Sequence, residues 1–289
     1  MGSQRNSKVG RAIFKESFNA LKQDIQVLAI PFLAFLATLV VGVFIVVSWI
    51  LLIPAMEIYN ASNVVQPALG ILAAFIAANI HVVSQAAVMA AANERFEGRT
   101  PTVAGSLKTA FGRYAQLSLF GFLEATVGLV LRAILERLGF LGGFLRIVGG
   151  LLWAVATYFA LPGILFGQQT AIESIKSSAV LIKEKWGNAL RSNIVASAVI
   201  ALVFLAGLGV VMSGVGLMVL NESASDSVLF SGLSLIGSGV VIFLIGGLLQ
   251  ASVMAYVRVA LYRYATGKSL PGFNEELLSQ AFKVKNSVI

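Results

Sequence analysis

The sequence predicts an all-α, polytopic membrane protein with six transmembrane helices in three repeats, each an interfacial helix followed by a helical hairpin. Three observations predict this fold. Hydrophobic residues make up 58% of the chain and charged residues 12%, with a mean hydropathy of +0.89, whereas soluble domains carry about 25% charged residues. Six apolar runs have about the 20 residues that cross a bilayer. Finally, two distant segments repeat each other, which indicates a protein built from similar units.

The six apolar runs use most of the 289 residues and leave no room for a water-soluble domain. The runs are Val27–Ile53, Pro67–Ala92, Leu117–Ile134, Ile147–Phe166, Ile194–Leu220 and Val228–Val257. The residues before the first run are polar and basic, and they lack the short apolar core and cleavage site of a signal peptide. We therefore expect the first run to remain as an anchor and residues 1–289 to form a single integral membrane domain.

The clearest repeat joins the second and sixth apolar runs. Gln85–Ala90 (QAAVMA) returns 165 residues later as Gln250–Ala255 (QASVMA), and each run then continues into a basic segment. The interval to the next glycine is 13 residues from Gln85 to Gly98 and 17 residues from Gln250 to Gly267. This difference is about one helical turn, so the helix could lengthen without changing its face.

A basic segment with apolar residues along one helical face precedes the first, third and fifth runs. The faces are Phe14, Phe18, Leu21 and Ile25, then Val103, Leu107, Ala110 and Tyr114, and then Ile175, Ala179, Ile182 and Trp186. Ser17, Ser106 and Ser178 recur at one position of this pattern. We interpret the chain as three units, about 11–101, 102–168 and 169–271, followed by a cytoplasmic tail, 272–289. The alternative is that any basic linker beside a membrane looks amphipathic.

The basic residues predict the orientation of the chain. Of the 21 Lys and Arg residues, 18 fall in the N-terminal arm, in the linkers after the second and fourth runs, and in the C-terminal segment. By the positive-inside rule this places both termini in the cytoplasm, for a multi-pass protein of the cell membrane. The three remaining basic residues, Arg132, Arg137 and Arg146, fall on the outer side. The turn that carries them is expected either to be partly buried or to have a function.

Small residues and proline predict how the spans pack. Glycine is frequent in the last two runs, at positions 207, 209, 214 and 216, and again at 237, 239, 246 and 247. Small residues let helix backbones approach each other in lipid, and we favour this explanation over the lining of a pore. Pro162-Gly163 interrupts the fourth run, where we expect a kink.

Glu124 lies in the middle of the third run, where a carboxylate is costly and is by default a functional candidate. At about 1.5 Å per residue, Gln85, Glu124 and Gln250 lie at similar depths from one membrane face, with His81 one turn deeper. We therefore predict an intramembrane polar layer of these four residues. It could bind a proton or a solute, or it could join helices through hydrogen bonds of about 1 kcal/mol each.

The amphipathic segments also carry a predicted lipid-headgroup site. Its members are Lys15, Lys22, Lys108, Arg113, Lys176 and Lys183. A basic residue beside an anionic leaflet gains about 1 kcal/mol, and the net charge of +8 suits such a surface. The predicted partners are therefore anionic membrane lipids, with no nucleic acid. The alternative is that these helices pack on the spans and that their lysines only set the topology.

The sequence offers little for catalysis. It has no cysteine, which excludes disulfides, thiolate nucleophiles and cysteine-based metal sites. His81 is the only histidine, so too few donors are present for a typical metal site. Gly267-Lys268-Ser269 lacks the earlier glycine of a P-loop, because Tyr262 stands there. We expect a protein that is not an enzyme and needs no metal or cofactor.

Four short motifs carry a resemblance to known proteins. They are Tyr262–Gly267 (YRYATG), Pro271–Phe273 (PGF), Ala156–Pro162 (ATYFALP) and Trp186-Gly187. With them the chain resembles a bacterial family of six-span membrane proteins of unknown function. More distantly, it is similar to the membrane domain fused to some glycerophosphodiester phosphodiesterases. The resemblance implies the membrane class over nearly the whole chain, and it implies no catalytic residues, because the phosphodiesterase chemistry belongs to a separate soluble domain.

Two functions of different classes follow from these features. The leading hypothesis is an integral membrane protein that binds or organises lipid of the cytoplasmic leaflet, because three basic amphipathic segments suit an anionic surface. The alternative is a small-solute or proton-coupled transporter that uses Glu124. Internal repeats also occur in transporters, so the repeat does not discriminate between the two.

Overall fold

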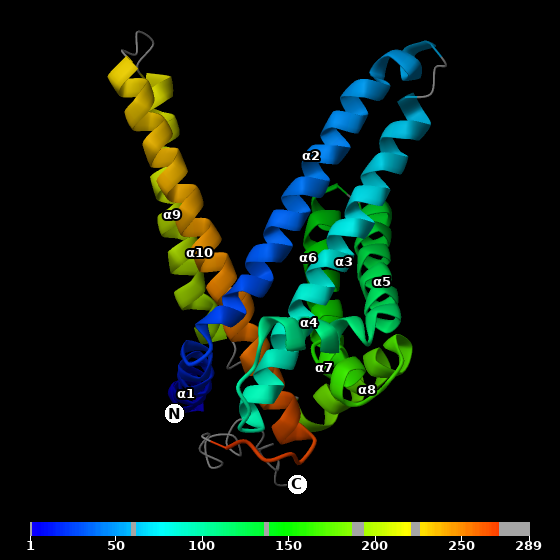
Figure 1. The fold of residues 1–289 in the computed structure, drawn as a ribbon, viewed down its shortest axis with the longest axis vertical. Helices are drawn as coiled ribbons and strands as arrows, with labels where there is room; N and C mark the ends of the chain where they lie inside the picture. The colour runs from blue at the N-terminus through cyan, green and yellow to red at the C-terminus, as the bar shows by residue number, and fades with distance from the viewer. Residues whose placement is uncertain (1, 59–61, 136–138, 187–193, 221–225, 272–289) are drawn as a thin grey trace.

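The structure is a computed structural model that describes residues 2–58, 62–135, 139–186, 194–220 and 226–271. These residues form helices joined by short turns, with no strand among them (Figure 1). The helices are α1 (Gly2–Lys22), η1 (Ile25–Leu28), α2 (Ala29–Ile58), α3 (Ser62–Phe96), α4 (Val103–Phe111), α5 (Tyr114–Leu135), α6 (Gly139–Ala156), α7 (Ala160–Phe166), α8 (Ala171–Trp186), α9 (Ile194–Leu220) and α10 (Asp226–Ala265). The expected all-α class is thereby confirmed.

The molecule has one packed end from which two helical hairpins diverge (Figure 1). We call the packed end the base; it consists of α1, η1, α4, α7 and α8 around the C-terminal halves of α3 and α10. We call the diverging hairpins the arms. One arm is α2 with the N-terminal half of α3, and the other is α9 with the N-terminal half of α10. The α5–α6 pair rises from the base alongside the first arm, with α5 packed against α3 (Figure 1).

The base contains the hydrophobic core. Its buried residues come mainly from 82–96 of α3, from 252–263 of α10 and from α7. Tyr256, Phe159 and Met89 are among the largest fully buried side chains. The rings of Phe96 and Tyr256 meet edge to face with centroids 5.8 Å apart, which joins α3 to α10. This end is therefore packed like the interior of a soluble domain.

α3 and α10 are longer than a membrane crossing requires. They have 35 and 40 residues, so at about 1.5 Å per residue they are roughly 52 and 60 Å long, against a hydrocarbon layer of about 30 Å. The surplus length lies in the base, where short helices of the same chain surround it. This explains why apolar runs that resemble simple spans are largely buried within the protein at one end.

Five helical segments are long and apolar enough to cross a membrane. They are Ile25–Pro54, Asn63–Phe96, Tyr114–Leu135, Leu141–Phe166 and Asp226–Ala265. They correspond to five of the six predicted spans and support a multi-pass membrane protein. For the remaining predicted span, Ile194–Leu220, the described apolar stretch is the shorter Leu205–Val219. The count of six spans stays a prediction.

A helix with a basic residue precedes each of three helix pairs in the chain: α1 precedes α2 and α3, α4 precedes α5 and α6, and α8 precedes α9 and α10. Ser17, Ser106 and Ser178, which recur at one position of the predicted repeat, are all buried, with at most 1% of each exposed. The three-unit interpretation stays a prediction. The proposed tail, 272–289, lies outside the described residues.

The buried face of α1 differs from the predicted one. Ile13, Ser17 and Leu21 are buried, whereas Phe14 and Phe18 are half-buried and Ile25 is 71% exposed. The apolar pattern was wrong at Ile25 because α1 ends at Lys22 and Ile25 belongs to the separate turn η1. Of the predicted face, Leu21 therefore lies in the core, Phe14 and Phe18 border it, and Ile25 is outside it.

The fourth span is interrupted earlier than its proline suggests. α6 ends at Ala156 and α7 starts at Ala160, so Pro162 lies in the first turn of α7. Proline has no N–H for the carbonyl of Tyr158, and a helix tolerates it best in its first turn. The helix accordingly ends before Pro162 and a new helix begins, so the structure has two separate helices where we expected one kinked helix.

Four glycines confirm close packing of α9 on α10. A Cβ at Gly214 would lie 2.6 Å from the carbonyl oxygen of Gly232, and one at Gly239 would lie 2.9 Å from that of Gly207. By contrast, a Cβ at Gly209, Gly216, Gly237 or Gly247 would meet nothing within 4 Å. The prediction of helix packing is thus confirmed at one set of glycines, and the other set faces open space.

Candidate functional site

Arg258 of α10 organises a polar cluster between α3, α5 and α10. Its Nη1 donates a hydrogen bond to Oε1 of Gln85 at 3.3 Å. Its guanidinium lies over the ring of Tyr158, 4.9 Å from the centroid, which is a cation–π contact. Its Nε is buried without a hydrogen-bond partner among the described residues. Arg258 therefore has both a fixed position and one unused donor.

Two further predicted residues lie within the reach of this charge. His81 is one turn before Gln85 on α3, and its ring Nε2 shares a hydrogen bond with the amide of Gln85. Glu124 of α5 is half-buried, and the positive charge of Arg258 acts on both Glu124 and His81. The structure thus joins His81 to Gln85 by a hydrogen bond and places Glu124 on the neighbouring helix α5, and the four-residue polar layer stays a prediction.

Gln250, the fourth predicted member, is not joined to this cluster by a hydrogen bond. It lies eight residues before Arg258 on α10 and is half-buried. The sequence interpretation missed Arg258 because it took this residue as the end of the sixth span. One feature of the sequence could have indicated this position. The interval from Gln250 to Gly267 is about one helical turn longer than the interval from Gln85 to Gly98, so the helix that contains Gln250 is expected to continue past Arg258. α10 indeed continues seven residues beyond Arg258, to Ala265.

A buried ion pair fixes the start of the first arm to the base. The carboxylate of Asp24, just before η1, accepts hydrogen bonds from both Nε and Nη2 of Arg95 near the end of α3. The Asp24 side chain is 0% exposed and that of Arg95 is 21% exposed. A two-pronged contact of this kind has a defined geometry and is stronger than a single hydrogen bond.

A second ion pair joins the ends of α3 and α10. Arg263, 5% exposed, donates to Oδ1 of Asn93 at 2.7 Å, to Oε1 of Glu97 at 3.2 Å and to the carbonyl oxygen of Ser269. Burial acts to raise the pKa of Glu97, but hydrogen bonds from Asn93, Arg99 and Arg263 outweigh burial and hold it below its ordinary value. Glu97 is therefore ionised and paired at neutral pH.

Helix caps orient the two short basic helices of the base. Thr102 caps α4 by accepting a hydrogen bond from the N–H of Gly105 at 3.1 Å. At the start of α8, Thr170 and Glu173 each accept a hydrogen bond from the other's backbone N–H, the reciprocal arrangement of a capping box. These hydrogen bonds lower the pKa of Glu173. Gln116 of α5 also accepts from the N–H of Ala171, which holds α8 against α5.

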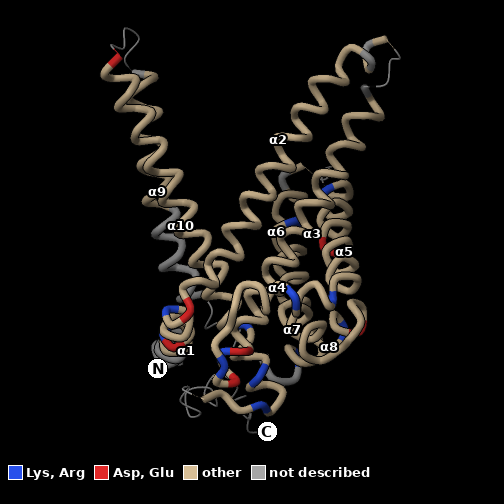
Figure 2. The backbone as a smooth tube through the Cα atoms, viewed as in Figure 1, with Lys and Arg blue, Asp and Glu red and all other residues tan. Residues whose placement is uncertain are grey.

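The six predicted headgroup residues all lie in or next to α1, α4 and α8, at the base. Five have exposed side chains, Lys15, Lys22, Lys108, Lys176 and Lys183, and Arg113 is half-buried. The Nζ of Lys22 lies 4.8 Å from the centroid of the Phe18 ring. Figure 2 shows charged residues of both signs gathered in the base, while the two arms are almost free of them. The structure thus places the predicted residues on one end of the molecule.

Metal coordination finds no support in the described ranges. No group of three or more His, Asp or Glu side chains lies close enough there to hold a metal ion. The polar cluster instead offers one cation, one carboxylate and two hydrogen-bonding side chains. Such a set can bind a small polar group or exchange a proton, and it can equally hold α3, α5 and α10 together.

Comparison with known proteins gives one match. Residues 68–272 match a family described as "Family of unknown function (DUF6159)"; the match covers α3 from residue 68 onward through α10 and leaves α1, η1 and α2 outside. No curated protein matches the chain in sequence. Neither finding supports the likeness to the membrane domain of glycerophosphodiester phosphodiesterases. Because the match covers well over half of the sequence, the chain belongs to the DUF6159 family, whose function is unknown.

Proposed function

We propose that this protein is a non-enzymatic component of the cell membrane that binds and organises anionic lipid at the cytoplasmic leaflet, next to its base. The observation that carries the proposal is the separation of charge and hydrophobicity along the molecule. The arms expose apolar side chains, and the exposed lysines of α1, α4 and α8 gather at one end. A membrane protein with this distribution presents its lysines to the headgroup region.

The packing of the short helices adds to this argument. They bury one side in the core through Ser17, Ser106 and Ser178, and each keeps lysines exposed on another side. A helix held in this way offers a fixed cation to the leaflet without having to fold on the lipid. The same packing suits the three-unit interpretation, in which each unit supplies one basic helix and one hairpin. Both termini would then lie on the cytoplasmic side.

The test is the lipid that remains bound during purification. Replacing Lys15, Lys22, Lys176 and Lys183 with Gln should reduce co-purified phosphatidylglycerol and cardiolipin about fivefold for each lysine that contacts lipid, because each such contact contributes about 1 kcal/mol. Replacing the same four residues with Arg keeps the charge and is the matched control. Native mass spectrometry of the three proteins gives the measurement. If the Gln variant retains as much anionic lipid as the Arg variant, the proposal is wrong.

The cluster around Arg258 favours a second candidate, a proton-coupled or small-solute transporter. A carboxylate within the field of a half-buried arginine can change its protonation when a ligand arrives. Glu124→Gln should then abolish pH-dependent uptake in reconstituted vesicles while the protein stays folded. If uptake of every solute tested is absent from the wild type as well, the cluster has a structural role.

A further inference from the structure

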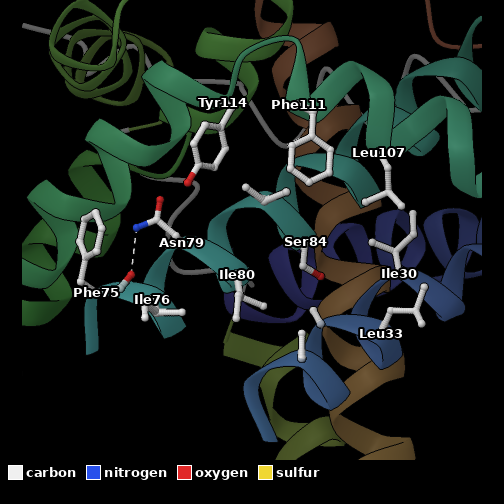
Figure 3. A pocket seen from close by; sticks show the side chains of 13 residues that line it. Ile30, Leu33, Phe75, Ile76, Asn79, Ile80, Ser84, Leu107, Phe111 and Tyr114 are labelled. Carbon is white, nitrogen blue, oxygen red and sulfur yellow. Dashed lines mark hydrogen bonds between the residues drawn. The ribbon is translucent and has the colours of Figure 1, made fainter. Parts of the chain in front are cut away.

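A cavity of about 470 Å³ lies between α2, α3, α4 and the first turn of α5. Its wall is mostly hydrocarbon, with Leu33, Ile76, Ile80 and Phe111 among the lining residues (Figure 3). Sites for small organic ligands have volumes of about 300–1,000 Å³ and are mostly apolar, with a few polar groups. The cavity therefore has the size and the lining of a ligand site.

Asn79 supplies an unused acceptor in this wall. The residue is 7% exposed, its Nδ2 donates to the carbonyl oxygen of Phe75 at 2.9 Å, and its Oδ1 is buried without a hydrogen-bond partner among the described residues. In Figure 3 the hydroxyl end of Tyr114 points toward the Asn79 amide. Buried carbonyl oxygens are normally hydrogen-bonded, so Oδ1 indicates a missing donor such as a hydroxyl group.

Two basic residues are the sequence neighbours of residues that line the cavity. Lys108 directly follows the lining residue Leu107 and is exposed, and Arg113 directly precedes the lining residue Tyr114 and is half-buried. Both belong to α4 or to the short turn after it, which closes one side of the cavity. A ligand with its chain between α2 and α3 would thus have its charged end next to two positive side chains.

We propose that this cavity binds an anionic phospholipid with a single acyl chain and a free glycerol hydroxyl. The chain occupies the apolar space between α2 and α3, the hydroxyl donates to Oδ1 of Asn79, and the phosphate pairs with Lys108 and Arg113. A diacyl phospholipid has both hydroxyls of its backbone glycerol esterified, so the only hydroxyl donors it can have are in its head group, beyond the phosphate. The inference rests on the proposed function for its setting in an anionic leaflet, and it adds one site and one ligand class.

Titration of the delipidated full-length protein with lysophosphatidylglycerol, followed by native mass spectrometry, tests the site. The wild type should bind one molecule, more tightly than it binds diacyl phosphatidylglycerol. Asn79→Leu removes the acceptor and should weaken binding about fivefold, the effect of one hydrogen bond. Ala34→Phe fills the cavity and should weaken binding by a factor of ten or more. Ala74→Phe makes the same change at an exposed alanine of α3 that does not line the cavity, and it should bind like the wild type.

A second measurement covers the case in which a cavity variant fails to fold. A lysophosphatidylglycerol with a photoreactive group on its chain should label the wild type in the segments 30–37 and 75–84. Labelling elsewhere, equal affinity of wild type, Asn79→Leu and Ala34→Phe, or equal affinity for the diacyl lipid would each overturn the inference. The fourfold Lys→Gln variant separates this result from the proposed function, because it leaves Lys108 and Arg113 intact. If the fourfold Lys→Gln variant loses diacyl lipid while the cavity variants bind lysophosphatidylglycerol like the wild type, the cavity proposal is wrong and the proposed function stands.

Discussion

The base and the arms of this protein are built from similar helices but differ in what surrounds their side chains. In the base, Met89 and Tyr256 are 0% exposed, and buried ion pairs join elements far apart in the chain. In the arms, Phe44 is 70% exposed and Phe230 is 74% exposed. None of the most apolar stretch of Ile25–Pro54 is buried within the chain.

The difference shows that one helix can serve two environments. The base is held by contacts within the chain, and losing one of them leaves a buried group without its partner. The arms have few such contacts, because lipid is the expected surrounding of their exposed apolar side chains. Substitutions in the base should therefore unfold the protein, whereas substitutions in the arms should change how two helices pack. Four substitution experiments, in order of decreasing effect, test this distinction.

The largest effect is expected at Asp24 in the base. Asp24→Ala leaves Arg95 near the core without its partner, and breaking a buried pair from one side costs about 3–5 kcal/mol. We expect a large drop in the temperature of unfolding in detergent, followed by light scattering or by tryptophan fluorescence. Asp24→Ala with Arg95→Met removes both charges and should recover part of the loss. A single variant as stable as the wild type would contradict the role of this pair.

A smaller effect, confined to one arm, is expected at the glycines between α9 and α10. Gly239→Leu places side-chain atoms where a Cβ alone would lie 2.5 Å from Val211, so the helices must separate, at a cost of about 1–3 kcal/mol. Gly237→Leu, on the same helix but facing open space, is the matched control. Hydrogen exchange of α9 and α10 should rise in Gly239→Leu alone. An equal rise in both variants, or a rise in the base, would argue against independent arms.

Glu124 lies on α5, beside α3. We expect the stability of the protein to depend on which residue replaces Glu124. Glu124→Gln keeps the volume and can still form hydrogen bonds, so the unfolding temperature should change little. Glu124→Leu removes a half-buried carboxylate that can form hydrogen bonds between helices, and it should destabilise the protein by about 1 kcal/mol. Thermal unfolding of the two variants in the same detergent provides the comparison. Equal stability of Gln and Leu would show that the cluster contributes nothing to packing.

The smallest effect is a pH dependence at Glu97. Its folded-state pKa is held below the ordinary 4.5, so its contribution to stability is complete above that value and is lost as the pH falls through the folded-state pKa. Glu97→Gln should therefore narrow the stability difference between pH 6 and pH 4, as measured by thermal unfolding. Glu94→Gln, one turn earlier, is the control. An unchanged pH dependence in Glu97→Gln would mean that the ion pair with Arg263 adds nothing.

Hydropathy and spacing predicted much of this fold, because long apolar runs and helical faces depend on local sequence. They placed Gln85, Glu124 and Gln250 at one depth with His81 one turn deeper, and of these four residues the structure joins His81 and Gln85 by a hydrogen bond. Arg258 was missed because a basic residue near the end of an apolar run also sets topology, and the sequence alone does not separate the two roles. The Asp24–Arg95 pair joins residues 71 positions apart, and no local pattern indicates such a contact.

The base also shows why apolar length overestimates membrane depth. The predicted span Pro67–Ala92 continues into the base, where α1, α4, α7 and α10 pack against α3. Burial against lipid and burial against protein select the same side chains, so hydropathy cannot distinguish them. The distinction depends on tertiary contacts, and a polar residue in such a run therefore lies nearer the membrane surface than counting suggests.

The central claim, that the base meets the membrane surface and the arms lie in the hydrocarbon, can be measured directly because the chain has no native cysteine. Spin labels at Lys108→Cys and Lys183→Cys report on the base, and labels at Phe44→Cys and Val241→Cys report on the arms. Collision with oxygen and with a water-soluble nickel complex, in phosphatidylglycerol liposomes, gives the depth of each label. We predict headgroup depth for the two base labels and hydrocarbon depth for the two arm labels. Base labels that collide with the nickel complex as freely as in solution, or arm labels accessible to water, would contradict the account.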